Sequence, residues 1–305
     1  MTLGCTIFRL KLAFMRLLMG RFNSLPFKGW YVSRYLYRRF GRFVRAVPAN
    51  KIAVEKPETI WQFWENPPHY SAVPLVVRGA IATVDKFRGD MNHIILDGKN
   101  LENYTDMPGW VMDRFRSGQM KFAHFGDLVR LDVLKHHGGV WMDATNYMTA
   151  QIPDEIMNLD FFVFHAITKG SPYGYFQNCF IRAKKNAWLL DAWHEMAMQY
   201  WRAEDKRMDY FQHQLMLRAI VQNDPRGKEF YARMPKIDQE PTHRFAGTYS
   251  RIPESGPSLL SPYDAEYWKR ASADSFFQKF NHGLEARAPE NSFMIQLSKI
   301  ALGEK

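Results

Sequence analysis

The sequence predicts an α/β fold in which helices flank a mainly parallel central sheet. Three observations support this class. After residue 51, short apolar runs alternate with helix-periodic segments, which is the order of βαβ units. The 305 residues are 46% hydrophobic and 15% aromatic, so they can bury one large core, and disorder of the whole chain is excluded. Glycines at 138 and 139 separate the most clearly patterned helix from an apolar strand.

The expected elements follow one another along the chain. Apolar runs predict strands at residues 60–64, 91–96, 140–142, 161–165 and 175–182. Helical periodicity predicts helices at residues 74–87, 186–202 and 208–222, and a further helix around Asp127. From residue 224 onward, prolines predict loops at 225, 235, 241, 253, 257, 262 and 289. Such a region is either a lid over a site or a surface cover.

The helix around Asp127 carries charge where a purely structural helix carries apolar side chains. Asp127 and Arg130 fall on its leucine face, whereas Asp132 and His136 fall on the other. Burying an ion is costly unless it finds a partner. The pattern indicates either a functional site or a buried Asp127–Arg130 salt bridge. The basic residues 135–137 suit the carboxyl end of a helix dipole and are interpreted as structural.

The apolar run at residues 140–142 places Asp143 at the carboxyl end of a strand. Ligands of open α/β sheets bind at such strand ends. Asp143 is therefore a candidate site residue. The alternative is that it only caps a turn, and spacing alone leaves both interpretations open.

The segment at residues 126–145 resembles the sugar-nucleotide-binding segment of the glycosyltransferases that include the capsular polysaccharide synthesis proteins. These are relatives of the family-32 transferases and of the large clostridial glucosylating toxins. The residues that match are Gly126, Asp127, Arg130, Gly138, Gly139, Trp141 and Asp143. Residues 59–68 resemble the family's opening strand, and residues 104–108 and 209–213 match more loosely. The resemblance implies a GT-A-like nucleotide-diphospho-sugar transferase fold.

The resemblance also implies an activity. A sugar would move from a nucleotide-diphospho-sugar, with UDP favoured, to a cell-surface polysaccharide or a lipid-linked glycan. The relatives retain the anomeric configuration, so the departing phosphate can accept the proton of the acceptor, and no general base stands out in this sequence. The enzyme's task is then to stabilise negative charge on the leaving diphosphate.

Roles for individual residues follow from the same resemblance. Catalysis is implied for Asp127, Arg130 and Asp143. Contact with the donor is implied for these three and for Trp61, Trp64, Trp141, Thr145 and His213. Trp64 would carry the uracil, since stacking of a base on an aromatic ring contributes about 1 to 3 kcal/mol. The alternatives are that Trp61 and Trp64 are core residues and that His213 is a satisfied polar residue.

A divalent metal, Mn²⁺ or Mg²⁺, is expected as cofactor. The wider group carries Asp-x-Asp, whereas this chain has Asp143-Ala144-Thr145. One carboxylate, two donor phosphates and a hydroxyl could hold such a cation, because it takes oxygen ligands and commonly keeps several waters. We therefore expect Asp143, Thr145 and His282 as ligands of a Lewis-acid metal. His282 resembles the late histidine of related transferases, although the tryptophan that usually follows it is absent.

The first 54 residues differ in charge from the rest. They contain eleven Lys and Arg and no Asp or Glu, which leaves 30 basic against 31 acidic residues in the remainder. Residues 5–20 are apolar but interrupted by three basic residues, so they suit neither a membrane span nor a signal peptide. We expect residues 1–54 to be a basic amphipathic helical leader before a catalytic domain at 55–305, and residues 1–47 to contact an anionic membrane surface. Docking of the leader on the body and binding to nucleic acid are the alternatives.

Composition limits the compartment and the rival functions. Cys5 and Cys179 show no metal-ligand spacing and no disulfide framework, so we expect a cytoplasmic protein at the cytoplasmic membrane face.

The rival function is that of a basic-tailed nucleic-acid- or membrane-associated protein with a non-catalytic α/β body. The near-neutral body argues against nucleic acid as a partner. The sequence near Asp143 lacks the carboxylates and histidines of a two-metal phosphohydrolase, and no Gly-x-Gly-x-x-Gly follows a strand, which disfavours a dinucleotide-dependent oxidoreductase.

Overall fold

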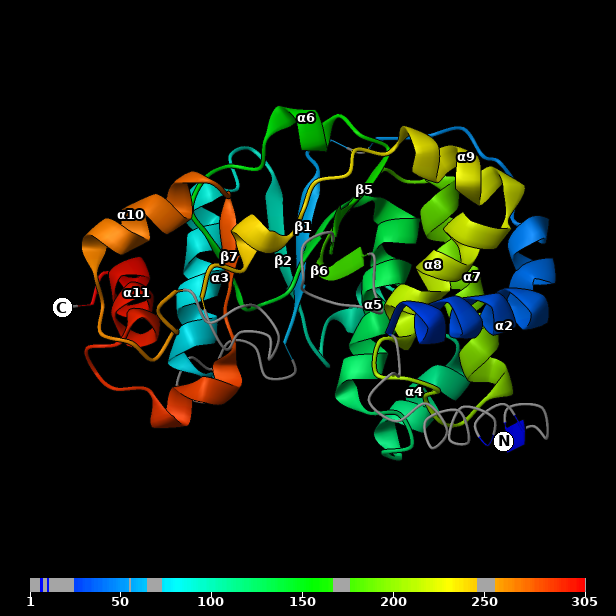
Figure 1. The fold of residues 1–305 in the computed structure, drawn as a ribbon, viewed down its shortest axis with the longest axis horizontal. Helices are drawn as coiled ribbons and strands as arrows, with labels where there is room; N and C mark the ends of the chain where they lie inside the picture. Colours follow the sequence, from blue (N-terminus) through cyan, green and yellow to red (C-terminus); the bar gives the residue numbers. More distant parts are fainter. Residues whose placement is uncertain are drawn as a thin grey trace.

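The computed structural model describes residues 6–7, 10, 25–54, 56–64, 73–166, 176–245 and 256–304 (Figure 1). The strands are β1 (Thr59–Phe63), β2 (Asn92–Leu96), β3 (Gly139–Met142), β4 (Asn146–Met148), β5 (Phe161–His165), β6 (Phe176–Ala183) and β7 (Phe277–Lys279). The α-helices are α2 (Leu25–Ala46), α3 (Leu75–Phe87), α4 (Gly109–Arg116), α5 (Phe122–His137), α6 (Asp154–Met157), α7 (Trp188–Ala203), α8 (Gln212–Asn223), α9 (Pro225–Arg233), α10 (Ala265–Ala273) and α11 (Phe293–Leu302). Short 3₁₀ helices are η2 (Leu101–Asn103), η3 (Glu240–Thr242) and η4 (His282–Arg287).

A five-stranded sheet in the order β2-β1-β3-β6-β5 forms the centre of the fold, and β4 pairs with β7 in a small second sheet. Strand β1 runs parallel to both β2 and β3, whereas β6 runs antiparallel to β3 and β5. Four of the five central strands therefore share one direction. The prediction of an α/β fold with a mainly parallel sheet is confirmed, with β6 as the reversed strand.

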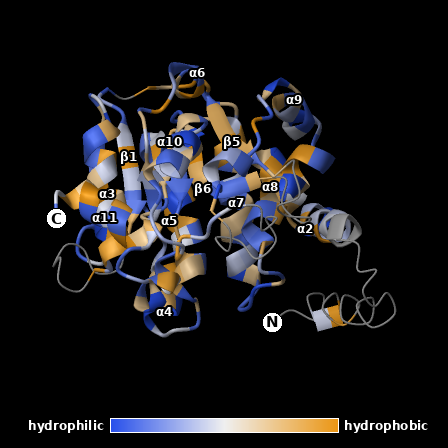
Figure 2. Ribbon diagram, turned by 60° about the vertical axis from the view of Figure 1, so that its left-hand side comes forward, coloured by the Kyte–Doolittle hydropathy of each residue, from blue (hydrophilic) through white to orange (hydrophobic). Residues whose placement is uncertain are grey.

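The alternation of side chains along the strands divides the core between the two faces of the sheet. Trp61 and Phe63 of β1 pack in a large cluster with α2, α5, α7 and α8. Ile60 and Val140 point to the other face and join Val84 of α3. Figure 1 shows the same division, with α3, α10 and α11 at one end of the molecule and α2, α7 and α8 at the other. In Figure 2, β5 is orange, as expected for a strand that is buried along its whole length.

The second part of the basic leader belongs to the core. Helix α2 buries one apolar side chain per turn, namely Val32, Leu36, Phe40 and Val44. It packs on α7 and α8, where the Tyr37 hydroxyl donates to the Asp224 carboxylate at 2.7 Å and Arg39 pairs with Glu204 at 2.9 Å. The docking alternative therefore holds for α2, whose buried side chains share a core cluster with α5, α7 and α8. The expected domain boundary after residue 54 stays a prediction. Most of residues 1–24 lie outside the described ranges.

No helix within the described ranges is long and apolar enough to cross a membrane. The expected contact of residues 1–47 with an anionic membrane surface stays a prediction.

The expectation of loops after residue 224 is wrong, because α9, α10, α11 and β7 form there. Pro225 lies in the first turn of α9, where a missing N–H leaves no bond unmade. Asp224 caps that helix by accepting from the backbone N–H groups of Arg226 and Gly227. Ser292 caps α11 in the same way. Prolines and polar residues in this part of the chain thus mark helix starts as well as loops.

The glycine pair between α5 and β3 is required by backbone conformation and by space. Gly138 has φ of 67° and Gly139 has φ of 101°, both in the region that favours glycine. A Cβ on Gly138 would lie 2.7 Å from the backbone nitrogen of Lys185, and one on Gly139 would collide with the carbonyl oxygen of Thr59. These two glycines let the backbone turn from α5 into β3 while packing directly against the backbone of Thr59 and Lys185.

We expect Gly139→Ala to lower the free energy of unfolding by about 2 to 4 kcal/mol, because it combines an unfavourable φ with a backbone collision. Gly98→Ala is the matched control, since among the described residues other than its chain neighbours none has a heavy atom within 4 Å of the added Cβ. Urea denaturation followed by circular dichroism measures both changes. Equal stability of the two variants would contradict the steric account.

Candidate functional site

The predicted catalytic residues meet at one edge of the central sheet. Asp143 follows β3 and Trp64 follows the parallel strand β1, so both lie beyond the carboxyl ends of neighbouring strands. Helix α5 brings Asp127 and Arg130 to the same place, where the Arg130 guanidinium lies 3.6 Å from the Asp143 carboxylate. Lys279, at the end of β7, contacts the other side of that carboxylate. Open α/β sheets bind ligands at this kind of edge.

Asp143 is an ionised carboxylate held from both sides. Its Oδ1 accepts from the indole Nε1 of Trp141 at 3.0 Å, and its Oδ2 accepts from Lys279 Nζ at 2.8 Å. Burial by itself would raise the pKa of Asp143, but the charges of Lys279 and Arg130 and the hydrogen bonds lower it to about 2. The side chain is still 26% exposed. Asp143 is therefore charged at neutral pH and accessible to a ligand.

Arg130 links the two carboxylates of the site. Its guanidinium lies 3.4 Å from Asp127 Oδ1 and 3.6 Å from Asp143 Oδ1, and its Nε donates to the Gly126 carbonyl at 3.2 Å. The guanidinium also stacks over the Trp141 ring, 5.2 Å from its centroid. These contacts fix the direction of a buried cation, which is the arrangement needed to recognise a bound anion.

Asp127 is positioned by residues that the sequence analysis missed. Asn178 of β6 donates from Nδ2 to Asp127 Oδ1 at 3.1 Å, and Gln214 of α8 donates to Asn178 Oδ1 at 3.2 Å. Burial by itself would raise the pKa of Asp127, but His213 and Arg130 lower it below its ordinary value. Asn178 and Gln214 lie far from Asp127 in sequence and belong to no motif, so no sequence signal pointed to them.

His213 is a buried, neutral member of the site. Burial lowers its pKa to about 4, and Asp127, Arg130 and Asp143 are among the charges that act on it. Its ring lies 4.4 Å from the ring of Trp193. Its Nε2 has no hydrogen-bond partner within the described part of the chain. A buried nitrogen in this condition is available for a ligand hydroxyl or a water.

The three tryptophans occupy different environments. Trp61 is buried on the α5 side of the sheet, donates to the Gly138 carbonyl at 2.9 Å and contacts the Tyr104 ring. This environment favours the alternative that Trp61 is a core residue, and its contact with a donor stays a prediction. Trp141 is also buried; its indole donates to Asp143, and the Arg130 guanidinium lies over its ring.

Trp64 is half-buried and meets His282 edge to face, with ring centroids 5.0 Å apart. Part of Trp64 remains exposed at the carboxyl edge of the sheet. Trp64 is therefore still a candidate for stacking on a base.

Lys279 was not predicted, and it changes the interpretation of the expected metal ligands. Its ammonium lies 2.8 Å from Asp143 Oδ2 and 2.7 Å from Thr145 Oγ1. No group of three or more His, Cys, Asp and Glu side chains in the described ranges is arranged to hold a metal ion. Because the Lys279 ammonium already contacts Asp143 and Thr145, the expected set of Asp143, Thr145 and His282 does not fit a divalent cation in this arrangement. Lys279 lies in the region that was predicted to be loops, which is why no pattern indicated it.

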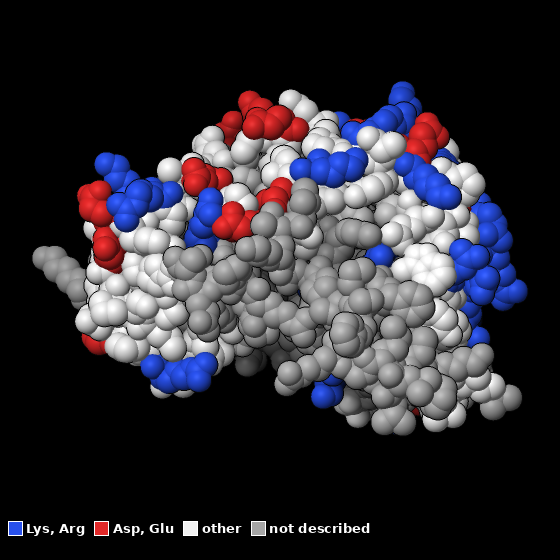
Figure 3. Space-filling model, viewed as in Figure 1, with Lys and Arg blue, Asp and Glu red and all other residues white. Residues whose placement is uncertain are grey.

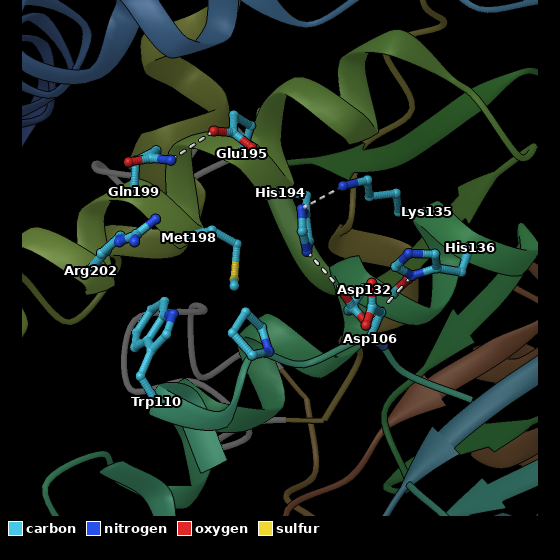
Figure 4. Close-up of a pocket in the computed structure, with 11 residues that line it drawn as sticks. Asp106, Trp110, Asp132, Lys135, His136, His194, Glu195, Met198, Gln199 and Arg202 are labelled. Atoms are coloured by element: carbon cyan, nitrogen blue, oxygen red, sulfur yellow. Dashed lines mark hydrogen bonds and ion pairs between the residues drawn. The ribbon is translucent and has the colours of Figure 1, made fainter. Parts of the chain in front are cut away.

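A second group of charges lies on the opposite face of α5, in a cavity of about 240 Å³ bordered by α4, α5 and α7 (Figure 4). Asp132 Oδ1 bonds to His194 Nε2 at 2.9 Å, and Asp132 Oδ2 accepts from the backbone N–H of Asp106 at 2.8 Å. His136 Nδ1 lies 3.5 Å from the same carboxylate. Asp132 is thus fully partnered and joins α5 to α7, which is a structural role.

Comparisons with known proteins point to carbohydrate chemistry. Residues 27–297 match the family described as capsular polysaccharide synthesis protein. The O-glycosyltransferase braB of Annulohypoxylon truncatum is 25% identical over 202 residues, which are 59% of this chain and 46% of that protein. The chain therefore spans about half the length of this curated relative. A solved structure of PaToxG Glycosyltransferase has a TM-score of 0.40 and 15% identity, covering 68% of this chain and 85% of its own.

Asp132→Asn should lower the free energy of unfolding by about 2 to 4 kcal/mol at pH 7, because it removes the buried carboxylate from two histidines. Burial by itself would raise the pKa of Asp132, but His136 and His194 lower it, so its stabilisation is present above about pH 4 and is lost as the pH falls further. The pKa of His136 is raised by Asp132, so that contribution is present below about pH 6.5 and is lost at higher pH. Denaturation curves from acid to alkaline pH should show the largest difference between these limits. A difference independent of pH would contradict this account.

Proposed function

The chain belongs to the capsular polysaccharide synthesis protein family, and we propose that it is a glycosyltransferase that uses a nucleotide-diphospho-sugar donor. The family match and the glycosyltransferase relative support the class of reaction. The observation that carries the proposal is the cluster of Asp127, Arg130, Asp143 and Lys279 at the carboxyl edge of the sheet. The position of this cluster supports a GT-A-like fold. A UDP-sugar as donor and a cell-surface polysaccharide or lipid-linked glycan as acceptor follow from the resemblance.

The proposed chemistry assigns separate tasks to the charged residues. Arg130 and Lys279 supply positive charge for the leaving diphosphate, on which negative charge develops in the transition state. Asp127 and the neutral His213 hold sugar hydroxyls, since Asp127 is a fixed acceptor and His213 has a buried nitrogen without a hydrogen-bond partner in the described ranges. Trp64 stacks on the nucleobase. The reaction retains anomeric configuration, and the departing phosphate accepts the proton of the acceptor hydroxyl.

We further propose that the protein lies on the cytoplasmic face of a membrane through its basic first 47 residues. The exposed side of α2 carries Trp30, which is 45% exposed, and the exposed basic residues Arg34, Arg38, Arg42 and Arg45. Figure 3 shows basic side chains gathered along the edge of the molecule where α2 and α9 lie. Each basic residue near an anionic lipid surface contributes about 1 kcal/mol of attraction. A lipid-linked acceptor would be met at such a surface.

Asp143→Asn should abolish donor hydrolysis and sugar transfer while leaving the fold intact, because it removes the charge that orients Arg130 and Lys279. Release of nucleoside diphosphate from a panel of nucleotide sugars, identified first by thermal shift, measures the effect. A donor at 100 times its Kd adds about 2.7 kcal/mol of stability and is easily seen in such a screen. Asp160→Asn is the matched control, since that carboxylate is 52% exposed and pairs with Lys184 on the surface. Wild-type turnover of Asp143→Asn would refute the assigned site.

Reversing two charges on α2, with Arg38→Glu and Arg42→Glu, should weaken binding to anionic vesicles by at least about tenfold. The exposed pair Lys269→Glu and Arg270→Glu on α10 changes the net charge equally and should bind like the wild type. Sedimentation with anionic and neutral vesicles and a gel-shift with DNA provide the measurement. Equal losses in both double variants, or binding to DNA as tight as to anionic vesicles, would favour a nonspecific basic surface.

A further inference from the structure

Lys279 lies where the sequence analysis expects a metal ion. Its Nζ donates to Asp143 Oδ2 at 2.8 Å and to Thr145 Oγ1 at 2.7 Å, and these are two of the three expected metal ligands. The backbone fixes this position, because Lys279 pairs with Asn146 in the β4–β7 ladder and the N–H of Phe280 donates to the Thr145 carbonyl at 2.9 Å. The lysine side chain is 11% exposed. The fold therefore builds the ammonium into the site.

The charges around Asp143 oppose a second cation. The oxygen Oδ2 already accepts from Lys279, and Oδ1 accepts from Trp141 and lies 3.6 Å from the Arg130 guanidinium. A divalent ion at the same carboxylate would face two positive charges in a partly buried site, where screening by water and salt is weak. Both oxygens of Asp143 are thus used by groups of the protein.

The third expected ligand, His282, contacts the ring of Trp64. It begins η4 and lies edge to face against Trp64, 5.0 Å between ring centroids. Burial is the main cause that lowers its pKa, and Lys279 lowers it further. His282 is therefore placed to border the base-binding surface beside Trp64.

We propose that Lys279 replaces the divalent cation, so that sugar transfer proceeds without a bound metal. This inference rests on the proposed function. An ammonium has three N–H donors, and the hydrogen bonds to Asp143 and Thr145 account for two of them in the described structure. The third N–H donates to the diphosphate. Arg130 lies on the other side of Asp143 and supplies a second cation.

The reaction balances with these groups alone. The bond between the anomeric carbon and the diphosphate oxygen breaks, and its electron pair stays on that oxygen, where Lys279 and Arg130 stabilise the negative charge. The oxygen of the acceptor hydroxyl forms the new glycosidic bond to the anomeric carbon. Its proton moves to the departing diphosphate. A fixed ammonium and guanidinium can stabilise this charge because they need no reorganisation during the reaction.

The test combines metal binding with nucleotide binding in the full chain. The electron paramagnetic resonance signal of free Mn²⁺ reports metal uptake, and calorimetry with UDP, GDP, CDP and ADP is run in EDTA and in Mn²⁺. We expect the wild type to take up no Mn²⁺ and to bind a nucleoside diphosphate with affinities that agree within about twofold in the two conditions.

Three lysine variants complete the experiment. Lys279→Met should weaken nucleotide binding in EDTA by at least about tenfold, because a charge-assisted hydrogen bond is lost. Lys279→Arg should recover part of the affinity, since the charge is kept. Lys269→Met makes the same change on exposed α10 and should bind like the wild type. Thermal denaturation checks that each variant is folded.

The outcomes separate the two proposals. Nucleotide binding that requires Mn²⁺, or a Lys279→Met variant that binds as tightly as the wild type, would overturn the role of Lys279 and leave the transferase proposal standing. Failure of all four nucleotides to bind the wild type in both conditions would overturn the proposed function and the inference with it.

Discussion

The carboxylate of Asp143 is shared by two cations from distant parts of the chain, and the site depends on this interaction. Arg130 comes from α5, thirteen residues before Asp143, whereas Lys279 comes from β7 near the end of the described structure. A buried or half-buried charge is stable only where its partners are held in place. The central sheet, α5 and the β4–β7 ladder are therefore coupled through one side chain.

Helix α5 carries charge on two faces for different reasons. On one face Asp127 and Arg130 border the candidate site and remain partly accessible. On the other face Asp132 is 1% exposed and satisfied by His194, His136 and a backbone N–H. Solvent exposure distinguishes the structural role of Asp132 from the proposed ligand-binding role of Asp127. A buried carboxylate whose oxygens both have hydrogen-bond partners cannot bind a ligand. One charged face of α5 thus holds α7 through Asp132 and His194. The other face places Asp127 and Arg130 at the candidate site.

Helices α2 and α11, which lie toward opposite ends of the chain, both pack into the body of the protein. Helix α2 packs against α7 and α8, and the family match begins at residue 27, inside that helix. Helix α11 packs on α3 so closely that a Cβ on Gly79 would lie 2.7 Å from the Cα of Ser298. This packing supports the C-terminal region that delivers Lys279 to the site.

The sequence by itself determined the features that depend on local pattern. Alternating apolar runs predicted the βαβ order, and the segment from Asp127 to Thr145 indicated both the family and the edge of the sheet where Asp127, Arg130 and Asp143 meet. Periodicity and turn residues act over a few positions, so these features can be recognised in the chain alone. The cytoplasmic location and the membrane contact stay predictions.

Only the tertiary structure decided which residues surround these groups. Asn178 and Lys279 approach Asp127 and Asp143 through pairing of strands far apart in sequence, and Trp61 is assigned to the core by the face of β1 that it occupies. The helices after Asp224 form because capping and packing outweigh the proline pattern. Contacts between distant segments leave no periodic signal in a single sequence. The physical reason is that their free energy depends on burial and charge pairing, which exist only once the chain has folded.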